Sequence, residues 1–325
     1  MKKIAVLLSH YNGDKYIKEQ IDSILTQEIP SEMSVSLFVR DDGSTKSDLS
    51  ILKEYQDNDR LTLIIGENVG VKLSFYDLMS SVSNYDYYFF SDQDDIWSEN
   101  KISVMVNQLE LWNSSQEPVG IFSDLWIANQ DGQPTGQLMK HESFKNFNAD
   151  SKKIHQNILK YYMVTGASFA FNELARQLAV SLGKSVFQAT RMHDATMAFI
   201  LVASGKLLYF DEPLVYYRQH GDNVIGYTKQ LGLLYKIRHV KNLFDEKSNK
   251  IFDMYIINKK LPDISDKRFY VIEKMMTKSV WQSPYYAWKL RYDIFGKKVW
   301  LSLFLFLIFG TTAIHKFQNI LRKGL

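Results

Sequence analysis

The feature that most constrains this chain is an alternation, over its first 130 residues, of short apolar runs with segments of helical periodicity. Ile4 to Leu8 is continuously apolar, as expected for a strand buried on both faces. Within Lys15 to Gln27, apolar residues recur every three or four positions, which predicts an amphipathic helix. Further strands are predicted at Val35–Val39, Leu61–Ile65 and Tyr87–Phe90, and further helices at Val71–Val82 and Ile102–Trp112. This order predicts an α/β fold with a mostly parallel central sheet.

Polar residues follow each predicted strand. They form four groups, which are Ser9–Gly13, Asp41–Ser44, Gly66–Gly70 and Ser91–Asp95. In an open parallel sheet, ligands bind outside the carboxyl ends of the strands. We therefore expect the four groups to line one edge of the sheet and to form a ligand site there.

The last of these groups contains three carboxylates in four residues, at Asp92, Asp94 and Asp95. Like charges this close repel one another, which favours a cation among them. Carboxylate oxygens select Mg²⁺ or Mn²⁺, which share their remaining positions with waters and substrate phosphates. A solvated acidic loop is the alternative. For Asp41 and Asp42, the alternative is an ordinary turn or helix cap.

Five motifs in chain order resemble those of family 2 glycosyltransferases, and within that family the bacterial rhamnosyltransferase group of cell-wall and capsular polysaccharide assembly. The motifs are Ser9-His10-Tyr11-Asn12-Gly13, Asp41-Asp42-Gly43-Ser44, Ser91-Asp92-Gln93-Asp94-Asp95-Ile96-Trp97, Met192-His193-Asp194 and Tyr217-Arg218-Gln219-His220-Gly221-Asp222-Asn223. The resemblance covers about residues 1–225. It implies a GT-A fold, the Rossmann-like fold of nucleotide-diphospho-sugar transferases, with nucleotide-sugar binding in 1–125 and the acceptor side in 126–225.

The same resemblance implies roles on the donor side. Asp41 matches the aspartate that reads the pyrimidine ring of the nucleotide. Tyr11 sits where backbone and an aromatic side chain flank that ring, and Ser9 opens the same motif.

Asp92 and Asp94 match the family's Asp-x-Asp (DXD) motif. Asp94 is expected to bind the metal directly, and Asp92 to lie near the ribose and a metal-bound water. His220 falls where a basic or metal-contacting group approaches the diphosphate. The implied metal ligands are therefore Asp92, Asp94 and His220, with Mg²⁺ or Mn²⁺ as cofactor.

On the acceptor side, Asp194 matches the family's general base. His193 precedes it where many members have Glu, and a hydrogen-bonded helix-start residue is the alternative for His193. Trp97 and Gly166 are candidate acceptor contacts, against the alternatives of a core aromatic and a close backbone approach. Arg218 is a secondary candidate.

The chemistry implied by this constellation is a direct displacement. An acceptor hydroxyl needs a base as it attacks the anomeric carbon, and a departing diphosphate needs a cation. One displacement inverts the anomeric centre. No G-x-G-x-x-G follows the first predicted strand and no G-x-S-x-G is present, which argues against hydride and acyl transfer.

By resemblance, the donor is dTDP-L-rhamnose, with a UDP-hexose as the alternative, and the acceptor is a lipid-linked saccharide. Two other functional classes stay open. A sugar-phosphate nucleotidyltransferase would also use an acidic metal site, but we would expect a Gly-rich basic loop after its first strand. A non-catalytic nucleotide-sugar binding protein would not need the acidic loop together with Asp194.

Charge divides the chain into an acidic body and a basic tail. Of the 39 Lys+Arg and 36 Asp+Glu, residues 1–225 contain 20 and 29, a balance of −9, and residues 226–325 contain 19 and 7, a balance of +12. The apolar segment Val299–Ile314 would rise about 24 Å as a helix, short of the roughly 30 Å of a bilayer core. Together with the basic residues of Tyr235–Lys241, it predicts a helical extension that faces an anionic membrane surface.

A helix in the core or in a dimer interface, and hence a homo-oligomer, is the alternative for Val299–Ile314. No nucleic-acid motif surrounds the basic residues, so nucleic acid is not expected as a partner. The chain has no cysteine, and the run Ile4–Leu8 is too short for a signal peptide. We therefore expect a cytoplasmic protein associated peripherally with the inner face of the cell membrane.

Overall fold

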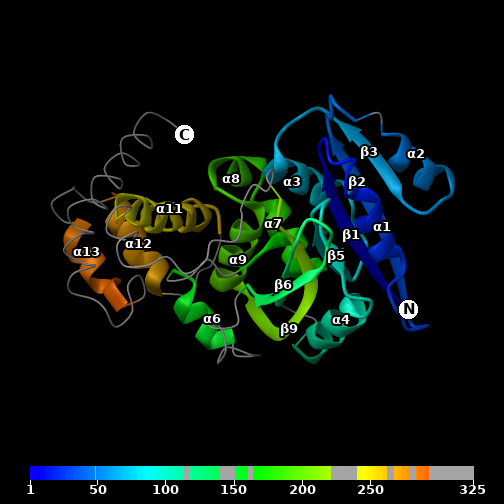
Figure 1. The fold of residues 1–325 in the computed structure, drawn as a ribbon. Helices are drawn as coiled ribbons and strands as arrows, with labels where there is room; N and C mark the ends of the chain where they lie inside the picture. Colours follow the sequence, from blue (N-terminus) through cyan, green and yellow to red (C-terminus); the bar gives the residue numbers. More distant parts are fainter. Residues whose placement is uncertain are drawn as a thin grey trace.

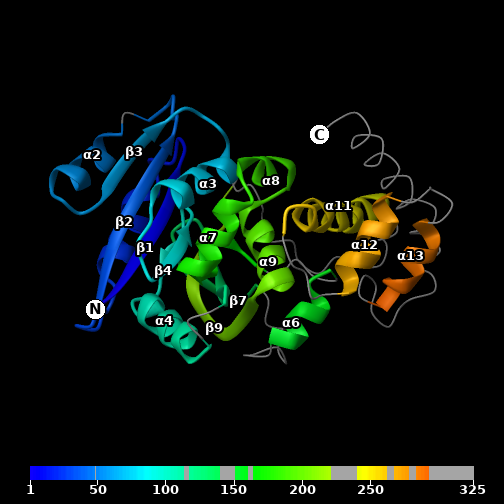
Figure 2. The same ribbon diagram turned by 180° about the vertical axis from the view of Figure 1, so that it is seen from behind.

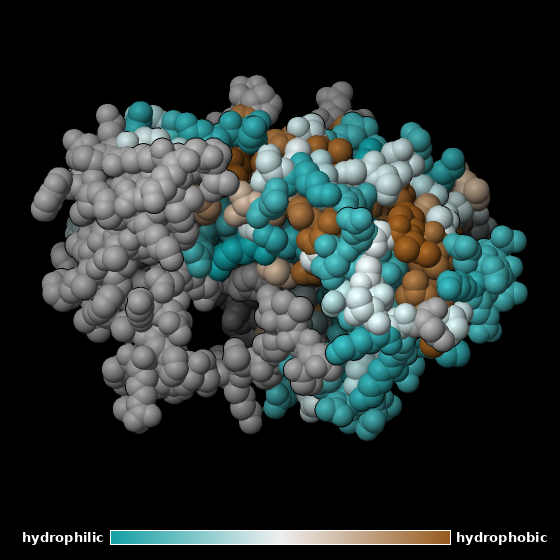
Figure 3. Space-filling view, turned by 90° about the horizontal axis from the view of Figure 1, so that it is seen from above, coloured by the Kyte–Doolittle hydropathy of each residue, from teal (hydrophilic) through white to brown (hydrophobic). Residues whose placement is uncertain are grey.

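The computed structural model describes residues 1–47, 49–112, 117–139, 151–159, 164–220, 240–261, 267–277 and 283–292. In these residues a central sheet of nine strands has helices on both faces (Figure 1). Three further helices stand at the end of the molecule opposite the first strands. Seen from above, hydrophobic side chains form separate patches within a largely hydrophilic surface (Figure 3).

The first half of the chain forms the predicted βα series. Its elements are β1 (Lys2–His10), α1 (Ile17–Leu25), β2 (Met33–Asp42), α2 (Ser50–Asp57), β3 (Thr62–Gly66), α3 (Val71–Ser81) and β4 (Tyr87–Ser91). The four strands run parallel in the order β3-β2-β1-β4. Every strand and helix predicted in this region is present, and α2 is an additional helix.

The second half adds strands of both directions. Its elements are β5 (Ile96–Trp97), α4 (Lys101–Trp112), β6 (Val119–Ala128), β7 (Pro134–Leu138), α6 (Ser151–Asn157), the 3₁₀ turn η1 (Gly166–Ser168), β8 (Phe169–Asn172), α7 (Glu173–Ser181), α8 (Lys184–Ala189), α9 (His193–Ser204) and β9 (Lys206–Arg218). The sheet continues from β4 as β8-β6-β9-β5, and β7 pairs with β6.

The prediction of a mostly parallel sheet holds for the first four strands and for the pair of β6 and β9, but the whole sheet is mixed. Strand β8 runs antiparallel to both β4 and β6. Its direction follows from its starting point, because η1 lies against β4 and leads directly into β8. A strand that begins at the edge where β4 ends has to run in the opposite direction.

Strand β1 shows how the core is divided. Ile4 to Leu8 are all fully buried. Ala5 and Leu7 belong to the cluster that contains side chains of α3 and α9, whereas Val6 belongs to the cluster that contains side chains of α1 and α4. Successive side chains of a strand point to opposite faces, so a continuous apolar run serves both layers.

Among the described residues beyond 225, where helical structure was predicted, the helices are α11 (Val240–Asn258), α12 (Lys267–Thr277) and α13 (Ser283–Lys289). Ile251, Met254 and Ile257 of α11 are fully buried and share a cluster with α9. The reverse view shows α9 between the sheet and α11 (Figure 2). Helix α11 is thus part of the core of the body.

No helix in the described part of the chain combines the length and apolarity needed to cross a bilayer. The segment Val299–Ile314, and residues 235–239 of the basic segment Tyr235–Lys241, lie outside the described residues.

Candidate active site

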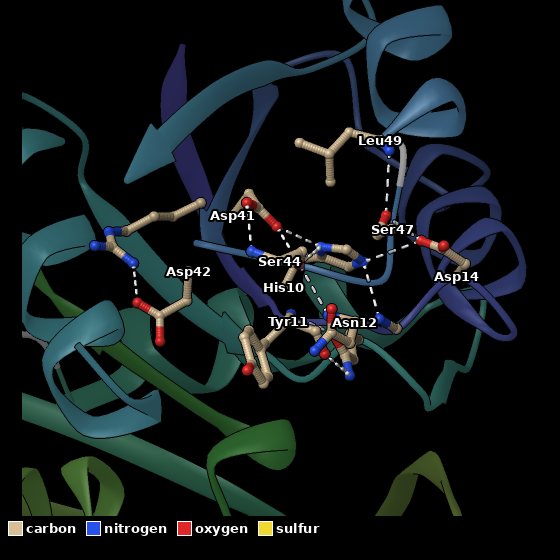
Figure 4. Close-up of polar contacts among 12 residues, drawn as sticks. His10, Tyr11, Asn12, Asp14, Asp41, Asp42, Ser44, Ser47 and Leu49 are labelled. Atoms are coloured by element: carbon tan, nitrogen blue, oxygen red, sulfur yellow. Dashed lines mark hydrogen bonds and ion pairs between the residues drawn. The ribbon is translucent and has the colours of Figure 1, made fainter. Parts of the chain in front are cut away.

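The carboxyl ends of the parallel strands bring the predicted polar groups to one edge of the sheet. His10 of β1 pairs in register with Asp41 of β2, and Leu8 pairs with Ser91 of β4. Asp42 in turn pairs with Gly66 of β3. The four groups chosen from the sequence therefore meet as predicted, and Figure 4 shows the part of this edge contributed by β1, β2 and the loops that follow them.

Asp41 holds the two loops together. Its Oδ1 lies 2.9 Å from Nδ1 of His10, and its Oδ2 accepts the backbone N–H of Ser44 at 3.0 Å (Figure 4). Burial alone would raise the pKa of Asp41, but hydrogen bonds from Ser44 and His10 outweigh it and lower this pKa below the ordinary value. Both oxygens of Asp41 thus bind groups of the protein, and its predicted contact with the pyrimidine stays a prediction.

Ser9 and Asp42 lie on the face of the sheet opposite His10 and Asp41, because side chains alternate along a strand. The Oγ of Ser9 is 2.6 Å from the Oγ of Ser74 in α3. Asp42 accepts the backbone N–H groups of Val69 and Gly70, at 3.0 and 2.8 Å, and pairs with Arg40. Two residues predicted at the nucleotide, Ser9 and Asp41, are therefore on opposite faces.

Asp42 lies at this edge of the sheet, and the sequence alone assigned it no role. Successive side chains of β2 point to opposite faces of the sheet, so only one of the adjacent residues Asp41 and Asp42 can share a face with Ser9. This alternation was the feature of the sequence that could have separated Asp42 from Asp41.

Tyr11 and Asn12 join the loop after β1 to its neighbours. Tyr11 is 43% exposed, and its backbone N–H donates to the side chain of Gln93 in the acidic loop. The side-chain oxygen of Asn12 accepts the backbone N–H groups of Thr45 and Lys46. The exposed ring of Tyr11 is thus carried on a loop fixed at both sides, as a group that contacts a ligand requires.

In the acidic loop, Asp94 and His220 are neighbours although they are 126 positions apart, since Nε2 of His220 lies 2.7 Å from Oδ2 of Asp94. Burial, together with the charges of Asp94 and Asp194, raises the pKa of Asp92 to about 7. Asp95 is fully buried, and burial and the same neighbouring charges of Asp94 and Asp92 raise its pKa well above the ordinary value. The mutual repulsion predicted for these carboxylates is therefore present.

A buried lysine lies beneath the acidic loop. Lys101, at the start of α4, is fully buried, and its Nζ donates to the backbone oxygen of Ala167 at 2.6 Å. Burial lowers the pKa of Lys101 well below the ordinary value, against the opposing charges of Asp95 and Asp92. The sequence analysis missed Lys101, and a cation was to be expected near three carboxylates that share one loop.

Trp97 lies below Lys101, whose Nζ is 3.3 Å from the ring centre. Only 3% of Trp97 is exposed, and its ring belongs to the core cluster that contains Phe89. This residue is the core aromatic that the sequence analysis kept as the alternative. It has no exposed ring face to offer an acceptor sugar, so the predicted acceptor contact at Trp97 is not supported.

Arg218 anchors the end of β9 to the acidic loop. It is 1% exposed, its backbone N–H donates to Asp95, and its Nε donates to the backbone oxygen of Asp94 at 2.8 Å. Its two Nη atoms donate to the backbone of Gln130 and to Glu19. Arg218 therefore fixes the strand end from which His220 reaches Asp94, and the structure gives it an anchoring position.

Asp194 lies in the first turn of α9 and is 3% exposed. Its Oδ2 accepts the backbone N–H of Gly166 at 2.9 Å, and its Oδ1 accepts the N–H of Ala195. These bonds fix the orientation of the carboxylate. Gly166 and Asp194, which are 28 positions apart, are thus brought together as a pair.

His193 packs behind this pair. It is 2% exposed, and its ring stacks on Phe75 with centroids 3.9 Å apart. Burial lowers the pKa of His193 to about 3, so the ring is neutral near pH 7. A Cβ at Gly166 would come within 2.8 Å of its Nε2. His193 therefore supports the backbone that holds Asp194, and position 166 requires glycine.

The segment before α9 is fixed from two sides. Nζ of Lys72 in α3 donates to the backbone oxygens of Gln188 and Thr190. Arg191 pairs at 3.2 Å with Asp253 of α11, a residue that is 2% exposed. Burial raises the pKa of Asp253 to about 6, against the opposing effect of Arg191. Helix α11 thus helps to fix the segment that precedes Asp194. No sequence motif indicated this role of α11.

The donor set suits a cation that is bound together with a ligand. Among the described residues, no group of three or more His, Cys, Asp and Glu side chains gathers as a metal cage. Asp94 and His220, together with Asp92 of the acidic loop, offer few protein ligands. Few are sufficient for Mg²⁺ or Mn²⁺, because these ions keep waters and also bind phosphate oxygens. The residues fit a divalent ion completed by a diphosphate.

The comparisons with known proteins agree with this geometry. Residues 5–169, just over half of the chain, match the model of "Glycosyl transferase family 2". The dTDP-rhamnosyl transferase RfbG of Shigella flexneri is 28% identical over 240 residues, which cover 70% of this chain and 77% of that protein. The uncharacterized glycosyltransferase alr2836 of Nostoc sp. is 24% identical over 231 residues, 68% of this chain and 66% of that protein.

Two solved structures have a similar fold. S. aureus TarS 1–349 in complex with UDP has a TM-score of 0.51 and 13% identity, covering 100% of this chain and 92% of that one. The mannosyltransferase PcManGT from Pyrobaculum calidifontis, in complex with GDP-Man and Mn²⁺, has a TM-score of 0.50 and 13% identity, covering 97% and 86%. These likenesses show a GT-A-like α/β fold. With the family match over residues 5–169, they lead to one conclusion: the chain belongs to glycosyl transferase family 2 and is a glycosyltransferase that resembles rhamnosyltransferases.

Proposed function

We propose that the protein is an inverting glycosyltransferase that moves L-rhamnose from dTDP-L-rhamnose to a hydroxyl of a lipid-linked saccharide in the synthesis of a bacterial surface polysaccharide. The observation that carries this proposal is the position of Asp194. It is held by Gly166 at the start of α9, and its charge contributes to the raised pKa of Asp92. One site therefore contains a base and an acidic donor loop.

The base is Asp194. Its bonds from Gly166 and Ala195 fix the carboxylate, which leaves a proton acceptor of constant orientation for the acceptor hydroxyl. As that oxygen forms its bond to the anomeric carbon, the bond from this carbon to the diphosphate oxygen breaks. The proton passes to Asp194, and the configuration at the anomeric carbon is inverted.

On the donor side, the exposed ring of Tyr11 would flank the nucleobase, and the loop that Asp42 holds at Val69 and Gly70 lies at the same edge. Asp94 and His220, with Asp92, would hold Mg²⁺ or Mn²⁺. Such an ion supplies positive charge that offsets the growing charge of the departing diphosphate.

The choice of donor rests on similarity to RfbG, which is described as a dTDP-rhamnosyl transferase. A UDP-hexose is the alternative donor, and it is favoured by the TarS structures, which were solved with UDP and with UDP-GlcNAc. Since lipid-linked acceptors lie in a membrane, we further propose that the protein works at the cytoplasmic face of the cell membrane.

The test is a set of transfer reactions with dTDP-L-rhamnose, UDP-glucose, UDP-N-acetylglucosamine and GDP-mannose. Each uses Mn²⁺ or EDTA and an extract of bacterial lipid-linked saccharides, and products are read by mass spectrometry and anomeric NMR. Calorimetry of dTDP and UDP binding is the companion measurement, because it does not depend on the acceptor.

We expect dTDP-L-rhamnose to give a product of inverted configuration, and EDTA to weaken nucleotide binding. Transfer from a UDP-sugar alone would favour the alternative donor. Retention of configuration, or calorimetric binding of neither nucleotide, would contradict the proposal.

A further inference from the structure

Helices α12 and α13, and the residues that directly follow α13, expose a group of large aromatic side chains. Tyr270 is 61% exposed, Tyr285 57%, Trp288 38% and Tyr292 57%. On the other side of the same helices, Phe269 and Ile272 of α12, and Leu290 just after α13, are buried and belong to the core cluster shared with α11. Each helix thus has one packed face and one aromatic face. We call the four exposed residues the aromatic surface.

Cations lie over the rings of this surface. Nζ of Lys274 is 5.1 Å from the ring centre of Tyr270, and Nζ of Lys289 is 4.8 Å from that of Tyr285. The guanidinium carbon of Arg291 is 4.3 Å from the ring of Trp288 and 4.4 Å from that of Tyr292. Residues 267–277 and 283–292 together contain five Lys and Arg against one acid, Glu273, a net charge of +4.

Single exposed apolar side chains are ordinary, but several large ones close together mark an interaction site. Tyr285, Trp288 and Tyr292 recur at intervals of three and four residues, and Arg291 contacts the rings of both Trp288 and Tyr292. The chemistry of this group selects the partner. A cation already covers one face of each ring, which leaves less ring surface for stacking on a base or a sugar. Tyrosine and tryptophan with nearby Lys and Arg instead match the headgroup layer of a membrane, where an apolar ring ends in a polar group and anionic phosphates attract the cations.

We propose that the aromatic surface of α12 and α13, with Lys274, Lys289 and Arg291, binds an anionic membrane surface. These residues support membrane binding whether or not the chain transfers a sugar. Only the purpose of that binding rests on the proposed function. α13 packs on α12, α12 on α11, and α11 on α9, the helix that begins with His193 and Asp194. A membrane bound at α12 and α13 is therefore connected by packed helices to the base.

The experiment is co-sedimentation of the full chain with vesicles of phosphatidylglycerol and phosphatidylcholine, against vesicles of phosphatidylcholine alone, at low and high salt. One variant removes charge, Lys289→Ala with Arg291→Ala. A second removes rings, Tyr285→Ser with Trp288→Ser. Matched controls come from surfaces on other helices: Lys53→Ala with Arg60→Ala at α2, and Leu111→Ser with Trp112→Ser at α4, where the two residues are 75% and 37% exposed.

We expect the chain to sediment with anionic vesicles and to be released by salt. The charge variant should bind about 30-fold more weakly, at about fivefold for each cation. The ring variant should also lose binding, whereas both control variants should bind as the unchanged chain does. Unchanged binding of the charge variant would overturn the proposal. So would a change of molar mass in light scattering for the charge variant alone, because the surface would then join two copies of the chain.

Transfer to a soluble saccharide acceptor separates the two proposals. Surface variants that transfer normally but do not sediment support both proposals. Loss of sedimentation in a chain that transfers no sugar from any donor leaves the membrane surface standing and removes the proposed function. If the ring variant fails to fold, as read by circular dichroism, the charge variant decides.

Discussion

The proposed donor side and the proposed acceptor side of the site are built in different ways. The donor side consists of loops that follow adjacent parallel strands, and register brings His10 beside Asp41. The acceptor side is assembled from distant parts of the chain, as Gly166 contacts Asp194 and Arg191 contacts Asp253. Donor binding should therefore survive single changes that disturb the base. The following predictions test this separation, from the largest expected effect to the smallest.

Asp194→Asn removes the proposed base and keeps its shape. We expect sugar transfer to fall by about 10²–10⁴-fold, and the calorimetric affinity for the nucleotide to stay within a factor of about three. Transfer at the normal rate would show that Asp194 is not the base. A large fall in nucleotide affinity would show that the two sides are not separate.

Gly166→Ala adds a Cβ that would lie within 2.8 Å of Nε2 of His193. Because His193 is packed against Phe75, the backbone that binds Asp194 has to shift. We expect kcat to fall by about 10²-fold and the free energy of unfolding to fall by about 1–3 kcal/mol.

The control is a double-mutant cycle with His193→Ala, which opens space beside position 166. The second substitution should recover part of the loss in kcat caused by Gly166→Ala. Strictly additive losses would contradict the steric explanation.

Asp253→Asn tests the contribution of α11 through pH. The folded pKa of Asp253 is about 6, above its ordinary value of 3.8, so between these values the folded chain binds more protons than the unfolded chain. Stability from this group is therefore present below about pH 4 and is lost as pH rises to about 6. The loss is at most about 3 kcal/mol.

Asparagine has no such titration, so the variant should flatten this part of the stability curve in urea unfolding between pH 4 and pH 7. An equal slope in the variant and the unchanged chain would show that the buried carboxyl is not responsible. Nucleotide affinity at pH 7 should be the same in both.

Asn12→Ala tests the donor side alone. Asn12 has a φ of 48° and bonds to the backbone of Thr45 and Lys46. Alanine loses these bonds and is strained at positive φ, so we expect a loss of about 1–2 kcal/mol in the free energy of unfolding. Nucleotide affinity should fall while kcat changes little. The variant Asn12→Asp should keep most of the nucleotide affinity. A fall in kcat alone would contradict the separation of the two sides.

The features of the fold that could be predicted from the sequence are those that local residue patterns determine. The apolar run of β1, the periodicity of α1, α3 and α4, and the meeting of polar loops at one edge follow from neighbouring residues, and all were confirmed. The antiparallel direction of β8 was not predictable, because it depends on where η1 lies in the finished fold.

Lys101 carried no motif and Arg218 was only a secondary candidate, and the partners of both residues are far away in the chain. Lys101 contacts a backbone oxygen 66 positions later, and Arg218 reaches Asp95 over 123 positions. Motifs identify residues that contact a ligand, whereas Lys101 and Arg218 contact other parts of the protein. Asp42 differs, because the alternation along β2 already distinguished it from Asp41.

Lys101 has a consequence for the pace of turnover. Every cycle includes an interval after the nucleotide product has left and before the next donor arrives, when Asp92, Asp94 and Asp95 face one another. Because Lys101 and Arg218 are both buried and bonded to the backbone, we expect them to stay in place through that interval. The loop should then keep its form between cycles, and each new donor should meet a prepared surface instead of waiting for one to refold.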